Sequence, residues 1–270
     1  MKVLLDATAV PADRGGVGRY VDELVPRLVR AGCEVGVLTQ ARDVQLFEPS
    51  GANLLVAPSF VSARPARLAW EQAGIPALVR RARPDVLHSP HYTMPLLTGT
   101  PVVVTVHDAT FFSHPEVHIP TKGRFFRAWS RMSARRASGI VVPSEATGDE
   151  VVRWVHADRS RVTVAYHGVD SERFRPVSDW ERARVRATLD IGDAPYVAFL
   201  GTLEPRKNVP ALVRAWVAVC AGLDRPPALV LAGGRGWDDR LDAELARVPS
   251  HLTVRRPGYL PMGDLAGFLS

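Results

Sequence analysis

Apolar residues follow two alternating patterns along the chain. Short runs rich in β-branched side chains, typical of strands, alternate with longer stretches whose apolar positions recur every three or four residues, typical of helices. The short runs predict strands at residues 2–6, 34–38, 53–56, 86–88, 102–106 and 140–142. This alternation predicts an α/β domain in which helices cover both faces of a parallel sheet.

Two longer helices are expected within this first domain. The first has apolar residues at helical spacing and a glycine at its expected C-cap: Val17, Val21, Leu24, Leu28 and Gly32. The second covers residues 68–83 and ends before Pro84. We therefore predict a Rossmann-like, doubly wound domain over residues 1–175.

A second alternation follows a Pro- and Gly-containing stretch at 176–194, which predicts an interdomain connection with a charged helix at 179–189. Strands are expected at 196–200, 228–232 and 252–254, and helices from Val209, over 239–248 and from Asp264. Asn208 is placed to cap the helix from Val209, and Pro210 lies in its first turn. We interpret 195–270 as a partial second Rossmann-like domain, and expect about a hundred further residues from ordinary domain size.

Composition agrees with two domains and excludes some chemistries. A chain of 270 residues with 46% hydrophobic content can bury more than one core. Its two cysteines, Cys33 and Cys220, are far apart in sequence, so we expect two buried thiols and neither a disulfide framework nor a metal site. The net charge of +6 is dispersed, which argues against a nucleic-acid partner and suits a small phosphate-bearing ligand.

The chain shows no targeting or membrane-spanning pattern. The apolar run at the N-terminus meets Asp6 early, and no stretch has 18 uninterrupted apolar residues. The expected localisation is cytoplasmic. Residues 121–138 place five arginines beside Phe125, Phe126, Trp129 and Met132; this pattern fits either an ordinary solvated helix face or a peripheral contact with the inner membrane face.

The first candidate site is a glycine-rich turn between the first strand and the first helix, Arg14-Gly15-Gly16-Val17-Gly18-Arg19-Tyr20. Glycines let a ligand approach the backbone, and a helix N-terminus offers N–H groups and partial positive charge to an anion. Val21 occupies the place of a third dinucleotide-binding glycine, and no acidic residue ends the second strand. These departures disfavour a nicotinamide dehydrogenase; a purely structural turn remains an alternative.

The second candidate site is Glu204-Pro205-Arg206-Lys207-Asn208, again between a strand and a helix. Two cations beside a helix N-terminus suit a diphosphate and would stabilise charge on a departing diphosphate. They would also make a divalent metal unnecessary. The alternative is an exposed pair of charges at a helix end.

Several motifs, in this order, resemble those of glycosyltransferase family 4. They are 15–20, Trp70-Glu71-Gln72, 84–90, Val106-His107-Asp108, 142–145, 167–170, 201–208, Ala232-Gly233-Gly234 and Pro257-Gly258-Tyr259. The resemblance spans the whole chain and is strongest for mannosyltransferases of polysaccharide assembly. It implies an α/β fold of the GT-B class, with two Rossmann-like domains, the second incomplete.

The resemblance also implies roles for individual residues. It assigns His107, Arg206 and Lys207 to catalysis, with His107 facing the transferred sugar and the two cations neutralising the diphosphate. It assigns donor binding to Gly15, Gly16, Gly18, Gly201, Thr202, Glu204, Gly233, Gly234, Gly258 and Tyr259, and the acceptor side to Arg19, His91 and Tyr92. The alternatives are a histidine that only bonds a neighbouring loop, turn glycines, and packing roles on the acceptor side.

Two departures from the family accompany these matches. Thr202 stands where some relatives have arginine, so part of their phosphate contact is absent or supplied differently. The family's glutamate pair, which holds the donor sugar and ribose, is expected later than Ser270.

The resemblance implies a retaining enzyme that moves a hexose from a nucleotide diphosphate sugar, with GDP-mannose the leading donor, to a glycan or lipid-linked acceptor. No cofactor besides this co-substrate is expected, and no metal is required. Three alternatives remain open: a nucleotide-sugar epimerase of the same fold, a non-catalytic fragment or partner-dependent subunit, and a peripheral membrane-binding module.

Overall fold

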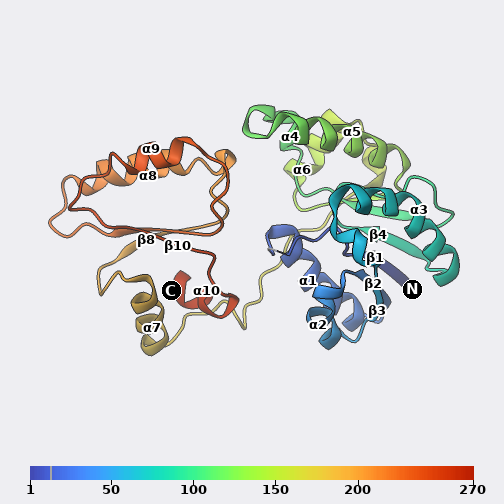
Figure 1. Cartoon of the computed structure of the whole chain (residues 1–270), viewed down its shortest axis with the longest axis horizontal. Helices are drawn as coiled ribbons and strands as arrows, with labels where there is room; N and C mark the ends of the chain where they lie inside the picture. Colours follow the sequence, from blue (N-terminus) through green and yellow to red (C-terminus); the bar gives the residue numbers. More distant parts are fainter. Residues whose placement is uncertain (13) are drawn as a thin grey trace. The chain divides into compact units, whose positions relative to one another are not determined.

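The chain divides into two units in the computed structural model, which describes residues 1–12 and 14–270 (Figure 1). The first unit is Met1–His167 and the second is Gly168–Ser270. The predicted first domain instead extended to residue 175, followed by a connection at 176–194. In the structure, the helix of that connection packs within the second unit.

The first unit contains a parallel sheet in the order β3-β2-β1-β4-β5-β6-β7. Its strands are β1 (Lys2–Asp6), β2 (Glu34–Thr39), β3 (Asn53–Val56), β4 (Val86–Ser89), β5 (Val102–Thr105), β6 (Gly139–Val142) and β7 (Val162–Val164). The order reverses between β1 and β4, which pair directly. In sheets of this kind, ligands bind outside the carboxyl ends of the strands at this reversal.

Helices cover both faces of the first sheet (Figure 1). They are α1 (Gly16–Arg30), α2 (Val44–Phe47), α3 (Arg64–Ala82), α4 (Thr110–Ser113), α5 (Pro120–Arg136) and α6 (Glu145–Glu150). Successive residues of β1 face opposite sides: Leu5 packs with Val21 of α1, whereas Leu4 packs with Ile75 of α3. Burial on both faces explains the nearly continuous apolar runs of these strands.

The second unit has a smaller parallel sheet in the order β10-β9-β8. It contains α7 (Asp179–Leu189), β8 (Tyr196–Leu200), α8 (Val209–Cys220), β9 (Ala228–Ala232), α9 (Arg240–Leu245), β10 (Val254–Gly258) and α10 (Leu265–Leu269). Trp216 of α8 and Leu241 of α9 pack on one face, and Val185 of α7 and Phe268 of α10 on the other (Figure 1).

Most predicted elements are confirmed, with three corrections. The strand expected at 252–254 is Val254–Gly258, because its parallel pairing with β9 runs from Val254 to Gly258. The helix expected at 68–83 begins earlier, at Arg64, since Pro65 is accommodated in its first turn. Asn208 occupies the N-cap position of α8, but its backbone is left-handed and its side chain makes no capping hydrogen bond.

Helix α5 coincides with the basic amphipathic segment. Its arginines Arg124, Arg131 and Arg135 are exposed, while Phe126 packs against the apolar core of the unit. Across the described part of the chain, no helix combines the length and apolarity that a bilayer crossing requires.

Gly233→Ala should destabilise the second unit. Its φ is 132°, and a Cβ there would lie 2.1 Å from the carbonyl oxygen of Gly201. We expect a loss of about 2 kcal/mol or more, because backbone strain and overpacking add. Gly222→Ala, where a Cβ meets no atom within 4 Å, is the matched control in urea unfolding. Equal stabilities of the two variants would contradict this account.

Candidate functional site

The glycine turn after β1 is open to solvent at the start of α1. Gly15 and Gly16 are exposed, and a Cβ at either position would meet no atom of the described residues within 4 Å. Gly15 is the N-cap and has no side chain with which to cap the helix, and among the described residues no side chain caps the first N–H groups of α1. Packing within the protein therefore does not require glycine at these two positions. Close approach of a ligand to the backbone would require it.

Gly18 differs from its neighbours because it is buried. A Cβ there would lie 3.1 Å from Cδ of Arg14 and 3.2 Å from Cγ1 of Val10. Close packing is thus sufficient to explain why a glycine occupies position 18. The donor-binding role of Gly18 stays a prediction.

Arg14 fixes the turn to the body of the unit. Its guanidinium lies 2.9 Å from a carboxylate oxygen of Asp22 and 3.6 Å from one of Asp43, above the ring of Phe47. Burial raises the pKa of Asp22 to about 6, against the opposing effect of Arg14. The turn is therefore held by a partly buried ion-pair cluster.

His107 lies just after β5 and has a defined hydrogen-bonding state. Its Nε2 is 2.8 Å from the carbonyl oxygen of Pro90, which can only accept, so Nε2 carries the proton. Burial lowers the pKa of His107, and this effect exceeds the opposing one of the Pro90 bond. The neutral ring, packed edge-on against Tyr20 at 5.0 Å, therefore retains Nδ1 as an acceptor.

A buried hydroxyl links the elements beneath His107. Oγ1 of Thr105 lies 2.8 Å from Nε2 of His88 and 3.3 Å from the hydroxyl of Tyr20. Burial first, and then the nearby His107, lower the pKa of His88 to about 4. Strands β4 and β5 and helix α1 are thus joined by neutral groups close to the candidate catalytic histidine.

The three residues predicted for the acceptor side lie in two places: His91 and Tyr92 in the loop after β4, and Arg19 on α1. His91 and Tyr92 follow β4, where Tyr92 has a left-handed backbone with φ of 54°. The Tyr92 hydroxyl accepts the Asp108 N–H at 3.2 Å, and its ring lies 6.1 Å from that of His107. Both residues line a cavity in the first unit; Arg19, on α1, is not among its lining residues.

The motif Trp70-Glu71-Gln72 supports this loop, a role that sequence reasoning missed. Glu71 is only 1% exposed and accepts hydrogen bonds from Arg67 at 2.9 Å and from Thr93 at 2.7 Å. Gln72 donates to the Met94 carbonyl and accepts the N–H of Leu96. The motif was visible in the sequence, but its partners in the loop, Thr93, Met94 and Leu96, lie more than twenty residues away.

In the second unit, the predicted glycines meet at the carboxyl ends of the three strands. The Gly201 N–H donates to Ala232, and the Gly233 N–H donates to Gly258 at 2.7 Å. The Leu203 N–H donates to Gly234 at 3.0 Å. Gly258 ends β10 with φ of 78°, and the following Tyr259 is 51% exposed.

The two predicted cations of the second unit are not equivalent. Arg206 donates to Glu204 at 2.6 Å, so a carboxylate already compensates its charge. Lys207 is exposed, and within the described residues its ammonium group makes no hydrogen bond or ion pair. Its Cε lies 3.9 Å from the position that a Cβ would occupy at Gly201. Thr202 is exposed in the same loop.

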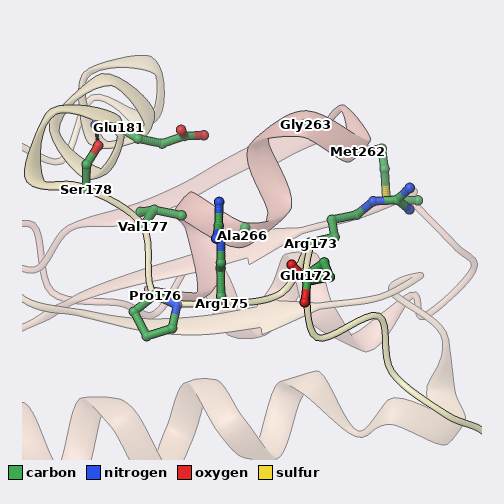
Figure 2. Close-up of a pocket in the computed structure, with 10 residues that line it drawn as sticks. All are labelled: Glu172, Arg173, Arg175, Pro176, Val177, Ser178, Glu181, Met262, Gly263 and Ala266. Carbon is green, nitrogen blue, oxygen red and sulfur yellow. Dashed lines mark hydrogen bonds between the residues drawn. The ribbon is translucent and has the colours of Figure 1, made fainter.

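A cavity of about 560 Å³ occurs elsewhere in the second unit (Figure 2). Its walls come from residues 172–178, the N-terminal part of α7 and residues 262–266, and they contain both Glu172 and Arg175. Neither Arg206 nor Lys207 lines it. Among the residues that the structure describes, no group of three or more His, Cys, Asp or Glu is arranged to hold a metal ion.

The chain is similar to known glycosyltransferases in sequence and fold. Residues 14–173 match the sequence model of Glycosyltransferase Family 4. O-antigen chain mannosyltransferase B of Escherichia coli is 25% identical over 98% of this chain and 73% of its own length. A D-inositol 3-phosphate glycosyltransferase of Actinosynnema mirum is 27% identical over 90% of this chain and 64% of its own.

A solved structure shows the same fold. HepE of Anabaena, in complex with UDP-glucose, superposes with a TM-score of 0.69 at 18% identity, over 98% of this chain and 71% of the other. This chain spans 51% of the length of a second D-inositol 3-phosphate glycosyltransferase, from Streptomyces avermitilis.

His88→Gln tests the buried imidazole. The pKa of His88 is about 4 in the folded unit and near 6.5 when unfolded, so the unfolded chain binds more protons between these values. Wild-type stability should therefore fall with decreasing pH relative to the variant, by on the order of 3 kcal/mol across this window. Urea unfolding at pH 7 and pH 4 measures the difference in unfolding free energy between wild type and variant. A difference that is the same at both pH values would contradict the lowered pKa of His88.

Proposed function

We propose, from the premise that this chain belongs to glycosyltransferase family 4, that it moves a hexose from a nucleotide diphosphate sugar to a glycan or lipid-linked acceptor with retention of configuration. Membership confirms the resemblance seen in the sequence, the glycosyltransferase class, and the α/β fold of the GT-B type with a smaller second sheet. The donor, the acceptor and the stereochemistry belong to the proposal.

The arrangement of Lys207 is the observation that carries the proposal. Its ammonium group, which has no hydrogen-bond or ion-pair partner in the part of the chain that the structure describes, lies beside Gly201 at the carboxyl edge of the second sheet, next to the start of α8. An anion there gains the lysine charge and close backbone approach over a glycine. Arg206, held by Glu204, contributes less free charge and serves to shape the loop.

The first unit supplies groups suited to a sugar and a phosphate. Neutral His107 keeps Nδ1 available to accept a hydrogen bond from a sugar hydroxyl. Open space at Gly15 and Gly16 leaves room for a phosphate near the first N–H groups of α1. Gly233, Gly234, Gly258 and Tyr259 are proposed nucleotide contacts of the second unit.

The chemistry proposed is a same-face displacement. The bond between the anomeric carbon and the diphosphate oxygen breaks as the bond to the acceptor oxygen forms, and the acceptor proton passes to the departing diphosphate. Lys207 stabilises the negative charge that develops on that leaving group. This route requires no pair of catalytic carboxylates, and the lysine takes the neutralising role for which other enzymes use a divalent metal.

GDP-mannose is the proposed donor. The name of the Escherichia coli relative, a mannosyltransferase, supports mannose, while the UDP-glucose bound to HepE makes UDP-glucose the first donor to compare. A cytoplasmic location with peripheral membrane contact through residues 121–138 fits a lipid-linked acceptor.

Lys207→Ala should weaken donor binding by about 2 kcal/mol, roughly thirtyfold in Kd, because a charge-assisted contact is lost. Calorimetric titration with GDP-mannose, UDP-glucose and an ADP-sugar measures this and identifies the donor. Arg225→Ala removes another exposed cation of the same unit and is the control. Equal affinities of the two variants would refute the role of Lys207.

Retention is tested on the product. Proton NMR of the newly formed glycoside should show the same anomeric configuration as the donor sugar. An inverted anomer would rule out the same-face displacement, and an altered sugar formed from the donor alone would indicate an epimerase.

A further inference from the structure

Three aromatic side chains from distant parts of the first unit meet near the carboxyl edge of its sheet. Tyr20 belongs to α1, His107 follows β5, and His167 ends the segment after β7. Their ring centroids are 5.0 Å apart for Tyr20 and His107, 5.3 Å for Tyr20 and His167, and 6.3 Å for the two histidines. We call these three side chains the ring cluster. His167 has no role in the site described so far.

Hydrogen bonds hold two members of the ring cluster in place. The Tyr20 hydroxyl lies 3.3 Å from Oγ1 of Thr105, and burial raises the pKa of Tyr20, so this hydroxyl stays protonated. Nε2 of His107 donates to the carbonyl oxygen of Pro90 at 2.8 Å. The ring of His167 therefore packs on a fixed support, tilted by 50° to Tyr20 and by 43° to His107.

His167 keeps its polar atoms accessible. The Ala165 N–H donates to the Val142 carbonyl at 2.8 Å, which ties the chain to the sheet two residues earlier. The His167 side chain is nevertheless exposed. Among the residues that the structure describes, neither of its ring nitrogens has a hydrogen-bond or ion-pair partner. Both nitrogens are therefore available to a ligand.

The two imidazoles of the ring cluster offer complementary hydrogen-bonding groups. Burial has the largest effect on the pKa of His107 and lowers it; the Pro90 bond opposes this effect, and His167 lowers the pKa further. Neutral His107 keeps Nδ1 as an acceptor, because its Nε2 proton is used by Pro90. An imidazole has at least one N–H in either protonation state, so His167 can always donate. A sugar hydroxyl both donates and accepts, so it can bond either histidine.

We infer that His167 is a second residue that contacts the transferred hexose, and that it bonds a hydroxyl group next to the one bonded by His107. A hydrogen bond spans roughly 3 Å between heavy atoms. Two imidazoles whose centroids are 6.3 Å apart can therefore reach oxygen atoms on neighbouring carbons of one sugar ring. One hydroxyl donates to Nδ1 of His107, and its neighbour accepts from His167. The inference rests on the proposed transferase function, in which His107 faces this sugar.

Calorimetric titration of the full chain with GDP-mannose, GDP, UDP-glucose and UDP tests the inference, because removal of the hexose turns each donor into its nucleoside diphosphate. His167→Ala should weaken binding of the sugar nucleotide about fivefold and leave binding of the matching nucleoside diphosphate unchanged, since one hydrogen bond to the hexose is lost. The matched control is His251→Ala, which removes an exposed histidine of the second unit and should bind all four ligands as wild type does.

Nitrogen-15 NMR of the imidazole rings gives an independent readout. The donor that binds should shift the ring signals of both His107 and His167, whereas its nucleoside diphosphate should leave the His167 signal in place. An equal loss of affinity for donor and nucleoside diphosphate in His167→Ala would make His167 a phosphate contact and overturn the inference. Wild-type affinity of this variant for both ligands, or an unshifted His167 signal, would overturn it too.

Lys207→Ala, titrated with the same ligands, separates this inference from the proposed function. Donor binding that depends on Lys207 but not on His167 would refute the inference and leave the proposed function in place. Binding that depends on His167 but not on Lys207 would refute the role of Lys207 and leave the His167 contact in place. Binding of neither donor would overturn both.

Discussion

Parallel strand pairing is the constraint on which both units depend. Because each crossover returns the chain to the same end of the sheet, every loop after a strand emerges at the carboxyl edge. In the first unit this gathers the glycine turn after β1, the His91–Tyr92 loop after β4 and His107 after β5. In the second unit it gathers Gly201, Gly233 and Gly258. Residues distant in sequence thus become neighbours without any specific attraction between their side chains.

The cations near these loops differ in burial and in whether a carboxylate compensates their charge. The protein compensates its buried and partly buried arginines: Arg67 by Glu71, and Arg14 by Asp22 and Asp43. The exposed Arg206 is paired with Glu204. An uncompensated buried charge would cost several kcal/mol, so these pairs hold loops in place and leave little charge for a ligand. Lys207 is exposed, uncompensated within the described residues, and lies beside Gly201 at the carboxyl edge of the second sheet. The proposed role of Lys207 in binding the donor rests on that difference.

The sequence predicted the elements well because their signals are local. Alternating apolar runs located most strands to within a residue or two, and the charged helix at 179–189 was predicted at its observed bounds. Pairing of Val254–Gly258 with β9 is a tertiary effect, and the strand prediction at 252–254 failed there. The site was predicted less completely. The glycine turns and Lys207 belong to motifs that are visible locally in the sequence. The different surroundings of Gly16, which is open, and Gly18, which packs beside Val10, could be seen only in the structure. Likewise, Tyr20, His107 and His167 come together only after folding.

The central claim is that the donor diphosphate is bound by Lys207 beside Gly201. A crystal structure of the chain with a nucleoside diphosphate tests it most directly. The account predicts a phosphate oxygen within hydrogen-bonding distance of Nζ of Lys207, at the carboxyl end of β8. A diphosphate bound elsewhere in the chain, with Lys207 left in solvent, would contradict it.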